Sequence, residues 1–194
     1  MSTSVPDAAV RTIGRVELPV AGTWRIDPEH ADVSFVGRHF MITKVRGRFT
    51  DVRGEVRVAE DPSDSELEVV IGMASVNSGS AVRDEHLRSA ELFDVASHPK
   101  ATFRSDSVDW DGVHGTVRGA LTIHGVTRRV GLAVVFEGHA RDPWGEDRAV
   151  FSARAHIDRE EFGVGWNLPL ESGKLLVSPQ IDLVIEVETV LQGS

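Results

Sequence analysis

The sequence predicts an all-β protein whose antiparallel strands close into a barrel of about eight strands. Most of the chain alternates apolar and polar residues, which is typical of strands with one face in a core and the other in water. In the run QIDLVIEVETVL, every second residue from Ile181 to Val187 is apolar. Several such runs reach about ten residues, and long consecutive antiparallel strands commonly avoid an exposed edge by closing into a barrel.

Residues 1–21 precede this pattern as an N-terminal extension that we expect to be poorly ordered, so the barrel domain covers residues 22–194. The expected strands are residues 30–39, 46–58, 66–76, 100–110, 113–124, 127–138, 148–157 and 174–191. The turns between them include Asp111-Gly112, which is a strong hairpin signal, Gly125, and the proline-containing segments EDPSDS and RDPWGED.

Residues 81–94 break the alternation and are expected to form a short helix. The apolar residues of this segment are spaced for one helical face: Val82, Leu87, Ala90 and Phe93. Ser80 is suited to cap the helix N-terminus. A second short helical turn is expected near residues 158–162.

The helix begins with a charged cluster, Arg-Asp-Glu-His at residues 83–86. Consecutive helical residues point about 100° apart, so these four side chains cannot converge on one substrate. We interpret them as the solvated or paired charges of a capped helix. The alternative is that Arg83, Asp84 or His86 faces a cavity as a polar group at its opening.

Composition and charge argue against several classes of protein. The 194 residues carry a formal net charge of −9, and nucleic acid is not an expected partner because affinity for phosphate comes from clustered Lys and Arg. The chain has no cysteine, which excludes disulfides, thiolate metal sites and a cysteine nucleophile. We find no secretion signal and no apolar run of the ~18 residues that a membrane helix needs. We therefore expect a soluble cytoplasmic protein.

The sequence shows no familiar catalytic or metal-binding motif. The eight histidines form no His-x-His pair and no His-Glu-x-x-His helix, the spacings that place two ligands on one metal. There is no nucleophile elbow, phosphate loop or dinucleotide fingerprint. We expect no cofactor, no metal site and no catalytic residue; a three-histidine site gathered from different strands is the open alternative.

Three glycines, Gly54, Gly115 and Gly119, lie on the apolar faces of their strands. They either let the barrel strands bend and coil or leave internal volume for a ligand. In the second case, apolar residues of the inner faces would line a cavity: Phe35, Phe103, Leu121, Val134 and Phe136. Taken alone, each of these residues fits an ordinary core position better.

Several strings of the sequence together resemble the YceI-like family. They are GTWRIDPEHADVSFVGRHF, RGRFTDVRGEV, VRDEHLRSAELFDVASHPKATFRS, VRGALTIHGVTRRVGL and IDREEFGVGW, in the order typical of that family. The most specific segment combines Arg83-Asp84, His86-Leu87, Ser89, Phe93-Asp94 and Pro99. The resemblance covers about residues 22–191, nearly everything outside the N-terminal extension.

This resemblance implies an extended, lipocalin-like barrel around a long apolar cavity. Members of the family are associated with isoprenoid chains, quinones or other long amphiphiles, have no established catalytic residues, and in some cases are thought to form homodimers. The sequence departs from the family at Ala31, where a serine is usual, so a hydroxyl contact is lost there. It also lacks the secretion signal of the many periplasmic members.

We accordingly expect a protein, not an enzyme, that carries or sequesters a long-chain isoprenoid, quinone or similar lipid. The expected apolar cavity residues are Phe35, Phe40, Leu87, Phe93, Phe103, Leu121, Val134, Phe136, Phe162 and Trp166. The expected polar residues at the opening are His39, Arg83 and His86, which would orient a phosphate or quinone oxygen. The helix at 81–94 and the loop WNLPLESGK would cover that opening.

Two other classes of protein are alternatives. An enzyme acting on an isoprenoid or quinone would need His39, Asp84 and His86 to meet at the cavity mouth. A structural or interaction protein would have a barrel filled by its own side chains and would bury an exposed edge or apolar patch in a dimer.

Overall fold

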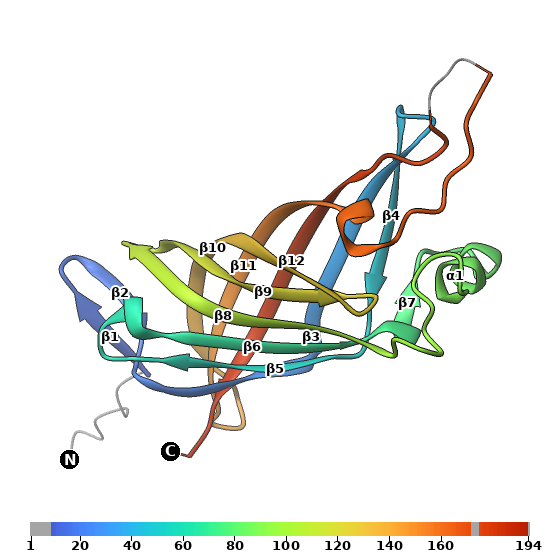
Figure 1. Ribbon diagram of the computed structural model, residues 1–194. Coiled ribbons are helices and arrows are strands. Elements are labelled where there is room, and N and C mark those ends of the chain that lie inside the picture. The colour runs from blue at the N-terminus through green and yellow to red at the C-terminus, as the bar shows by residue number, and fades with distance from the viewer. Residues whose placement is uncertain (1–8, 172–174, 194) are drawn as a thin grey trace, which may run out of the picture.

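The computed structural model describes residues 9–171 and 175–193, which fold mostly into antiparallel strands (Figure 1). The strands are β1 (Val10–Ile13), β2 (Val16–Pro19), β3 (Gly22–His39), β4 (Thr43–Phe49), β5 (Val52–Val58), β6 (Glu66–Gly72), β7 (Val76–Asn77), β8 (Lys100–Asp111), β9 (His114–Ile123), β10 (Val126–Arg141), β11 (Asp147–Asp158) and β12 (Gln180–Leu191). The helical elements are the α-helix α1 (Ala81–Arg88) and the 3₁₀ turns η1 (Pro62–Asp64), η2 (Met73–Ser75) and η3 (Arg159–Phe162). In the described ranges, no helix is long and apolar enough to span a membrane.

The strands close into the expected eight-stranded antiparallel barrel. Neighbours around the ring are β3, β5, β6, β8, β9, β10, β11 and β12, and β12 pairs back with β3. The closing ladder extends from the pair Trp24–Leu191 to the pair Val36–Asp182. Closure removes the two open edges that a flat sheet of these strands would expose.

The longest strand, β3, connects the two halves of the barrel. Its first residues pair with β5 over Gly22–Arg25, and its last pair with β4 over Val33–His39. The register with β12 shifts between these parts, where Pro28 interrupts the run of ladder donors. β4 and β5 follow one another along the same side of β3, so the single strand expected at 46–58 is divided into two.

The N-terminal segment differs from the expected poorly ordered extension. Residues 10–19 form the β1–β2 hairpin, in which Val10 pairs with Pro19. Leu18 of this hairpin is buried in a cluster with Trp24, and this apolar burial fixes the segment against the barrel. Sequence alternation missed it because each strand has only four residues. Residues 1–8 lie outside the described residues.

Helix α1 ends earlier than the expected residue 94. Ser80 caps it as predicted, because its hydroxyl accepts a hydrogen bond from the backbone N–H of Arg83. After Arg88 the chain leaves the helix at Ser89, whose backbone N–H and hydroxyl both donate to the His86 carbonyl. The segment from Ser89 to β8 continues as turns.

The strand expected at 30–39 begins earlier, at Gly22, and the remaining boundaries follow the prediction with local changes. The helical turn expected at 158–162 is present as η3. The strand expected at 66–76 ends at Gly72 because η2 follows it. The last strand begins at Gln180 instead of residue 174, which lies outside the described residues.

Two of the interior glycines, Gly54 and Gly119, allow close approach of neighbouring strands, whereas the Trp110 ring fills the space at Gly115. A Cβ added to Gly54 would lie 2.2 Å from the carbonyl oxygen of Glu68, and a Cβ added to Gly119 would lie 2.2 Å from that of Arg104. These positions therefore favour the bending interpretation, because neighbouring backbone already occupies the space that a side chain would fill.

Arg148 on β11 forms ion pairs with Asp27, in the bulge of β3 where the register with β12 shifts, and with Asp142, in the turn between β10 and β11. Its Nη1 lies 2.7 Å from Asp27 Oδ2, and its Nε lies 2.9 Å from Asp142 Oδ2. Burial alone would raise the pKa of Asp27, but hydrogen bonds from Arg148, from His30 and from the backbone N–H of Glu29 lower the pKa to about 2. The ionised carboxylate is thus part of the folded structure.

We expect the substitution Arg148→Met to lower the free energy of unfolding by about 2 kcal/mol, because two carboxylates lose charged hydrogen bonds. The pKa of Asp27 is about 2 in the folded state and ~3.9 in an unfolded chain, so its contribution is complete above pH ~4 and is lost as the pH falls toward 2. The difference in stability between wild type and variant should shrink in the same interval. Urea unfolding at pH 7 and pH 3 measures both effects.

The matched control is Arg154→Met, on the same strand but exposed to solvent. It should change the stability by less than about 0.5 kcal/mol. An equal loss in both variants would show that the network around Arg148 does not stabilise the bulge.

Candidate functional site

A cavity of about 510 Å³ inside the barrel is the candidate site. Its lining residues extend from Leu18 and Trp110 near the β1–β2 hairpin to His39 and Trp166 at the other end. The volume falls within the range of roughly 300–1,000 Å³ that is typical of small-molecule pockets. This cavity argues against the alternative of a barrel filled by its own side chains.

The wall of the cavity is almost wholly apolar because each strand turns alternate residues inward. From β9 and β12, the residues at the wall are Val117, Leu121, Ile123, Ile181, Leu183, Ile185 and Val187. On β12 these are the residues that alternation assigns to one face. The outer face of the same strand carries acidic residues, Glu186 among them.

Most of the apolar residues expected at the cavity line it. They are Phe35, Leu87, Phe93, Phe103, Leu121, Val134, Phe162 and Trp166. Phe162 is 1% exposed, so this side chain packs η3 onto the barrel. The three expected polar residues, His39, Arg83 and His86, also line the cavity.

Two expected cavity residues, Phe136 and Phe40, lie elsewhere. Phe136 packs in the buried cluster with Trp24 and against the ring of Phe151, and it is not among the residues that line the cavity. Phe40 is 45% exposed. Its backbone has a φ of 54°, so the alternation of β3 ends before it, and its ring packs on His39 at a centroid distance of 4.0 Å.

In Figure 1, α1 and the segment that follows η3 lie at the same end of the barrel, and residues of both line the cavity. The edge of the His86 ring contacts the Trp166 ring at a centroid distance of 4.4 Å and an interplanar angle of 89°. His86 Nε2 also lies 2.9 Å from Glu91 Oε2. One aromatic contact therefore links the two segments that border the opening.

Arg83 and Asp84 have different roles although they are adjacent. The Arg83 side chain lines the cavity, and its Nε donates to the hydroxyl of Ser78 at 2.9 Å. Asp84 is buried and accepts hydrogen bonds from the backbone N–H and the hydroxyl of Ser78. These hydrogen bonds lower the pKa of Asp84. Asp84 thus fastens α1 to the preceding segment, and it does not join His39 and His86 as the enzyme alternative requires.

Arg159 is a residue of the cavity wall that the sequence analysis missed. It is 7% exposed, and its Nε and Nη1 donate to the backbone carbonyls of Ser178, Val164 and Trp166. Its Nη2 has no hydrogen-bond partner among the residues described. Burial lowers the pKa of Arg159 by disfavouring the charged form. A cation with an unused donor therefore lies in the wall of an apolar cavity.

Periodic alternation could not have found Arg159, because that pattern locates apolar residues on inner faces. The available signal was local. Asp158 precedes Arg159 at the end of a strand, and the segment then turns with Gly163, whose φ is 77°. A charged residue at such a strand end is suited to hold the loop carbonyls that follow it.

We compared the chain with known proteins. The family described as the YceI-like domain matches residues 24–189. Protein YceI of Salmonella newport is 39% identical over 176 residues, which cover 89% of each chain. Protein YceI of Escherichia coli O157:H7 is 38% identical over the same length and coverage.

Solved structures share the fold. The YCEI protein of Campylobacter jejuni gives a TM-score of 0.68 at 29% identity, over 80% of this chain and 90% of that one. BcnA of Burkholderia cenocepacia gives 0.74 at 21% identity, over 84% and 98%. A polyisoprenoid binding domain from Saccharophagus degradans gives 0.61 at 19% identity, over 88% and 99%. At such low identity, the last two show a common architecture alone.

We expect Arg159→Met to loosen the segment after η3, because three backbone carbonyls lose their donor. The free energy of unfolding should fall by about 2 kcal/mol. Amide hydrogen exchange should accelerate in residues 163–171 and much less in β9 and β10. Unchanged exchange in that segment would contradict a role for Arg159 in holding it.

Proposed function

The chain belongs to the YceI-like family, and from this membership and the apolar cavity we propose that it binds a long-chain isoprenoid, quinone or similar amphiphilic lipid and carries or sequesters it. The observation that carries the proposal is the cavity itself, which extends along the barrel between apolar strand faces. The polyisoprenoid binding domain from Saccharophagus degradans, which has the same fold, supports this class of ligand.

Apolar burial would supply most of the binding free energy. Each methylene group that leaves water contributes about 0.8 kcal/mol. A chain of many carbons therefore has far more free energy available than one polar contact of about 1 kcal/mol. The entropy lost when the chain is confined reduces this gain. The length and width of the cavity, more than any single polar group, would then set specificity.

The polar headgroup of the lipid would lie at the mouth near His39, Arg83 and His86. Arg159 adds a buried cation to the same end of the barrel, where η3 and the start of the following loop line the cavity. Guanidinium groups bind phosphate and other oxygen-rich groups well because their donors form a planar fork. An amphiphile with an apolar tail and an oxygen-bearing head matches this arrangement, with the tail directed toward Trp110.

Extraction of the purified protein with organic solvent tests the proposal directly. Mass spectrometry of the extract should reveal a long-chain amphiphile in roughly stoichiometric amount, and added prenyl alcohols or quinones should raise the melting temperature of the stripped protein. A clean extract together with an unchanged melting temperature for every such compound would count against a lipid-binding function.

Leu121→Arg should lower the affinity for an added prenyl chain by about tenfold or more, because a charge would replace an apolar side chain in the cavity wall. Leu121→Trp fills the same space without a charge and should also lower the affinity. It serves as the test variant if Leu121→Arg does not fold. Binding is measured by displacement of a fluorescent lipid.

The matched control is Ala120→Arg, one residue away on the outer face of β9. It should leave affinity unchanged. Equal affinity for a folded Leu121→Trp variant and the wild type would show that the lipid does not occupy this part of the barrel.

A further inference from the structure

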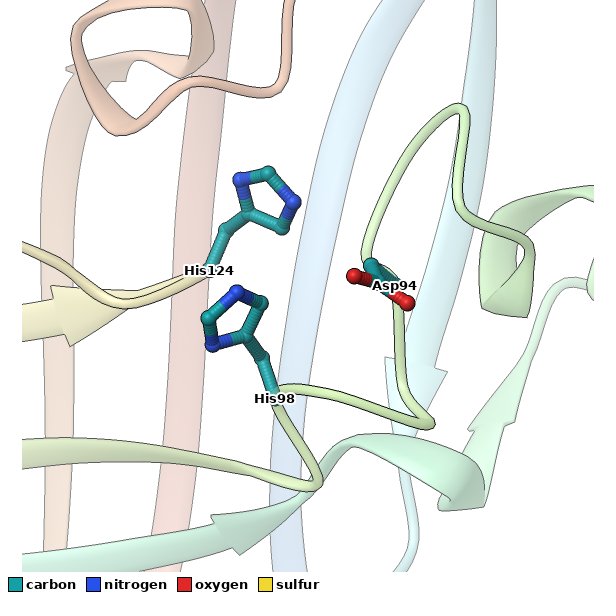
Figure 2. Close-up of side chains that lie close together, drawn as sticks. All are labelled: Asp94, His98 and His124. Carbon is teal, nitrogen blue, oxygen red and sulfur yellow. The ribbon is translucent and has the colours of Figure 1, made fainter.

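Three potential metal ligands, Asp94, His98 and His124, meet beside the cavity mouth. Their donor atoms all lie within 4.8 Å of one another, and each residue is partly buried. Asp94 and His98 belong to the segment between α1 and β8, whereas His124 lies in the turn between β9 and β10. Figure 2 shows the two histidine rings one above the other, with Asp94 across from them.

The backbone fixes each of the three positions. The Asp94 carbonyl accepts hydrogen bonds from the N–H groups of Ser97 and His98, at 3.0 and 2.8 Å, so Asp94 and His98 are held in one turn. His124 and Gly125 have φ values of 51° and 72°, and the strands on either side pair through Ile123 and Val126. This is the tight hairpin geometry in which both central residues are left-handed.

The surroundings leave room for both rings. A Cβ on Gly125 would lie 2.7 Å from His98 Cε1, and a Cβ on Gly163 would lie 3.1 Å from His124 Nδ1. The rings of His98 and His124 are 4.8 Å apart between centroids and inclined at 65°. In the part of the chain that the structure describes, none of the three side chains has a hydrogen bond or an ion pair. Their donor atoms are thus not committed to another partner.

A second group of potential metal ligands with a similar composition lies elsewhere in the described chain. Asp27, His30 and Glu188 also place donor atoms within 4.8 Å of one another. Arg148, however, already lies 2.7 Å from Asp27 and 3.3 Å from Glu188. A metal ion there would have to displace a guanidinium group, whereas no cationic side chain pairs with Asp94 in the described residues.

We propose that Asp94, His98 and His124 bind a divalent transition-metal ion, with Zn²⁺ preferred. Two imidazole nitrogens and one carboxylate oxygen are ligands of this class of ion, and three protein ligands leave a fourth position open. Donor atoms around a tetrahedral zinc lie ~3.4 Å apart, so binding would draw the three side chains together.

The bound ion would join two segments that border the cavity. Phe93 precedes Asp94 and Ile123 precedes His124, and both of these neighbours line the cavity wall. The ion would therefore connect the segment after α1 to the rim of the barrel at the β9–β10 turn. Metal binding itself does not rest on the proposed lipid function, because it needs only the three side chains.

Calorimetric titration of chelator-treated, tag-free protein with ZnCl₂ tests the site. One ion should bind per chain, and Co²⁺ should give the visible absorption of a tetrahedral complex. His98→Asn and Asp94→Asn should each lower Zn²⁺ affinity by at least about tenfold, since loss of an outer partner alone costs about 10–100-fold. His124→Asn should do the same and suits the left-handed backbone, which asparagine tolerates.

Two control variants separate this site from adventitious binding. His30→Gln removes a member of the second group, and His114→Gln removes an exposed histidine at the start of β9; both should bind Zn²⁺ like the wild type. Zinc should also slow amide exchange in residues 89–99 in the wild type and not in His98→Asn. The proposal is overturned if millimolar Zn²⁺ does not bind, or if binding persists unchanged in folded His98→Asn and His124→Asn.

Discussion

The structure depends on the pairing of β12 with β3, because this ladder turns a row of strands into a ring. It spans the pairs from Trp24–Leu191 to Val36–Asp182 and includes the bulge whose Asp27 carboxylate binds Arg148. Once the ring is closed, every second residue of each strand faces an interior shielded from water, and that interior must be apolar. The cavity and its chemistry follow from closure combined with alternation.

The two ends of the ring are closed in different ways. At the hairpin end, Trp24 and Phe136 are buried in an apolar cluster, and Arg11 forms an ion pair with Glu60. At the other end, α1 and the segment after η3 meet through His86 and Trp166 without a strand ladder between them. In the described residues, each end has one buried arginine nitrogen without a hydrogen-bond partner, and both arginines line the cavity: Arg11 Nε near the hairpin and Arg159 Nη2 near the second end.

Alternation in the sequence predicted the ring and most of its inner wall, because strand parity directly determines which side chains face inward. It could not predict which buried residues reach the cavity, so Phe136 is buried as expected but is covered by its neighbours and does not line the cavity. It failed at Phe40, where a left-handed turn ends the period. Arg159 and the group around His98 and His124 were missed because they depend on contacts between distant segments. Such contacts leave no regular spacing in the sequence.

The number of backbone hydrogen bonds between neighbouring segments determines where the cavity can open. Separating barrel strands would break many backbone hydrogen bonds at once. In contrast, β7 pairs with β4 through only two residue pairs, and α1 contacts the segment after η3 through the edge-to-face pair of His86 and Trp166. Regions with few ladder bonds open at lower free energy than the sheet. Displacement of the segments at this end would thus cost less free energy than separation of barrel strands. If the proposed lipid enters at this end, contacts between these segments, whether between His86 and Trp166 or through an ion held by Asp94, His98 and His124, would slow its entry and exit.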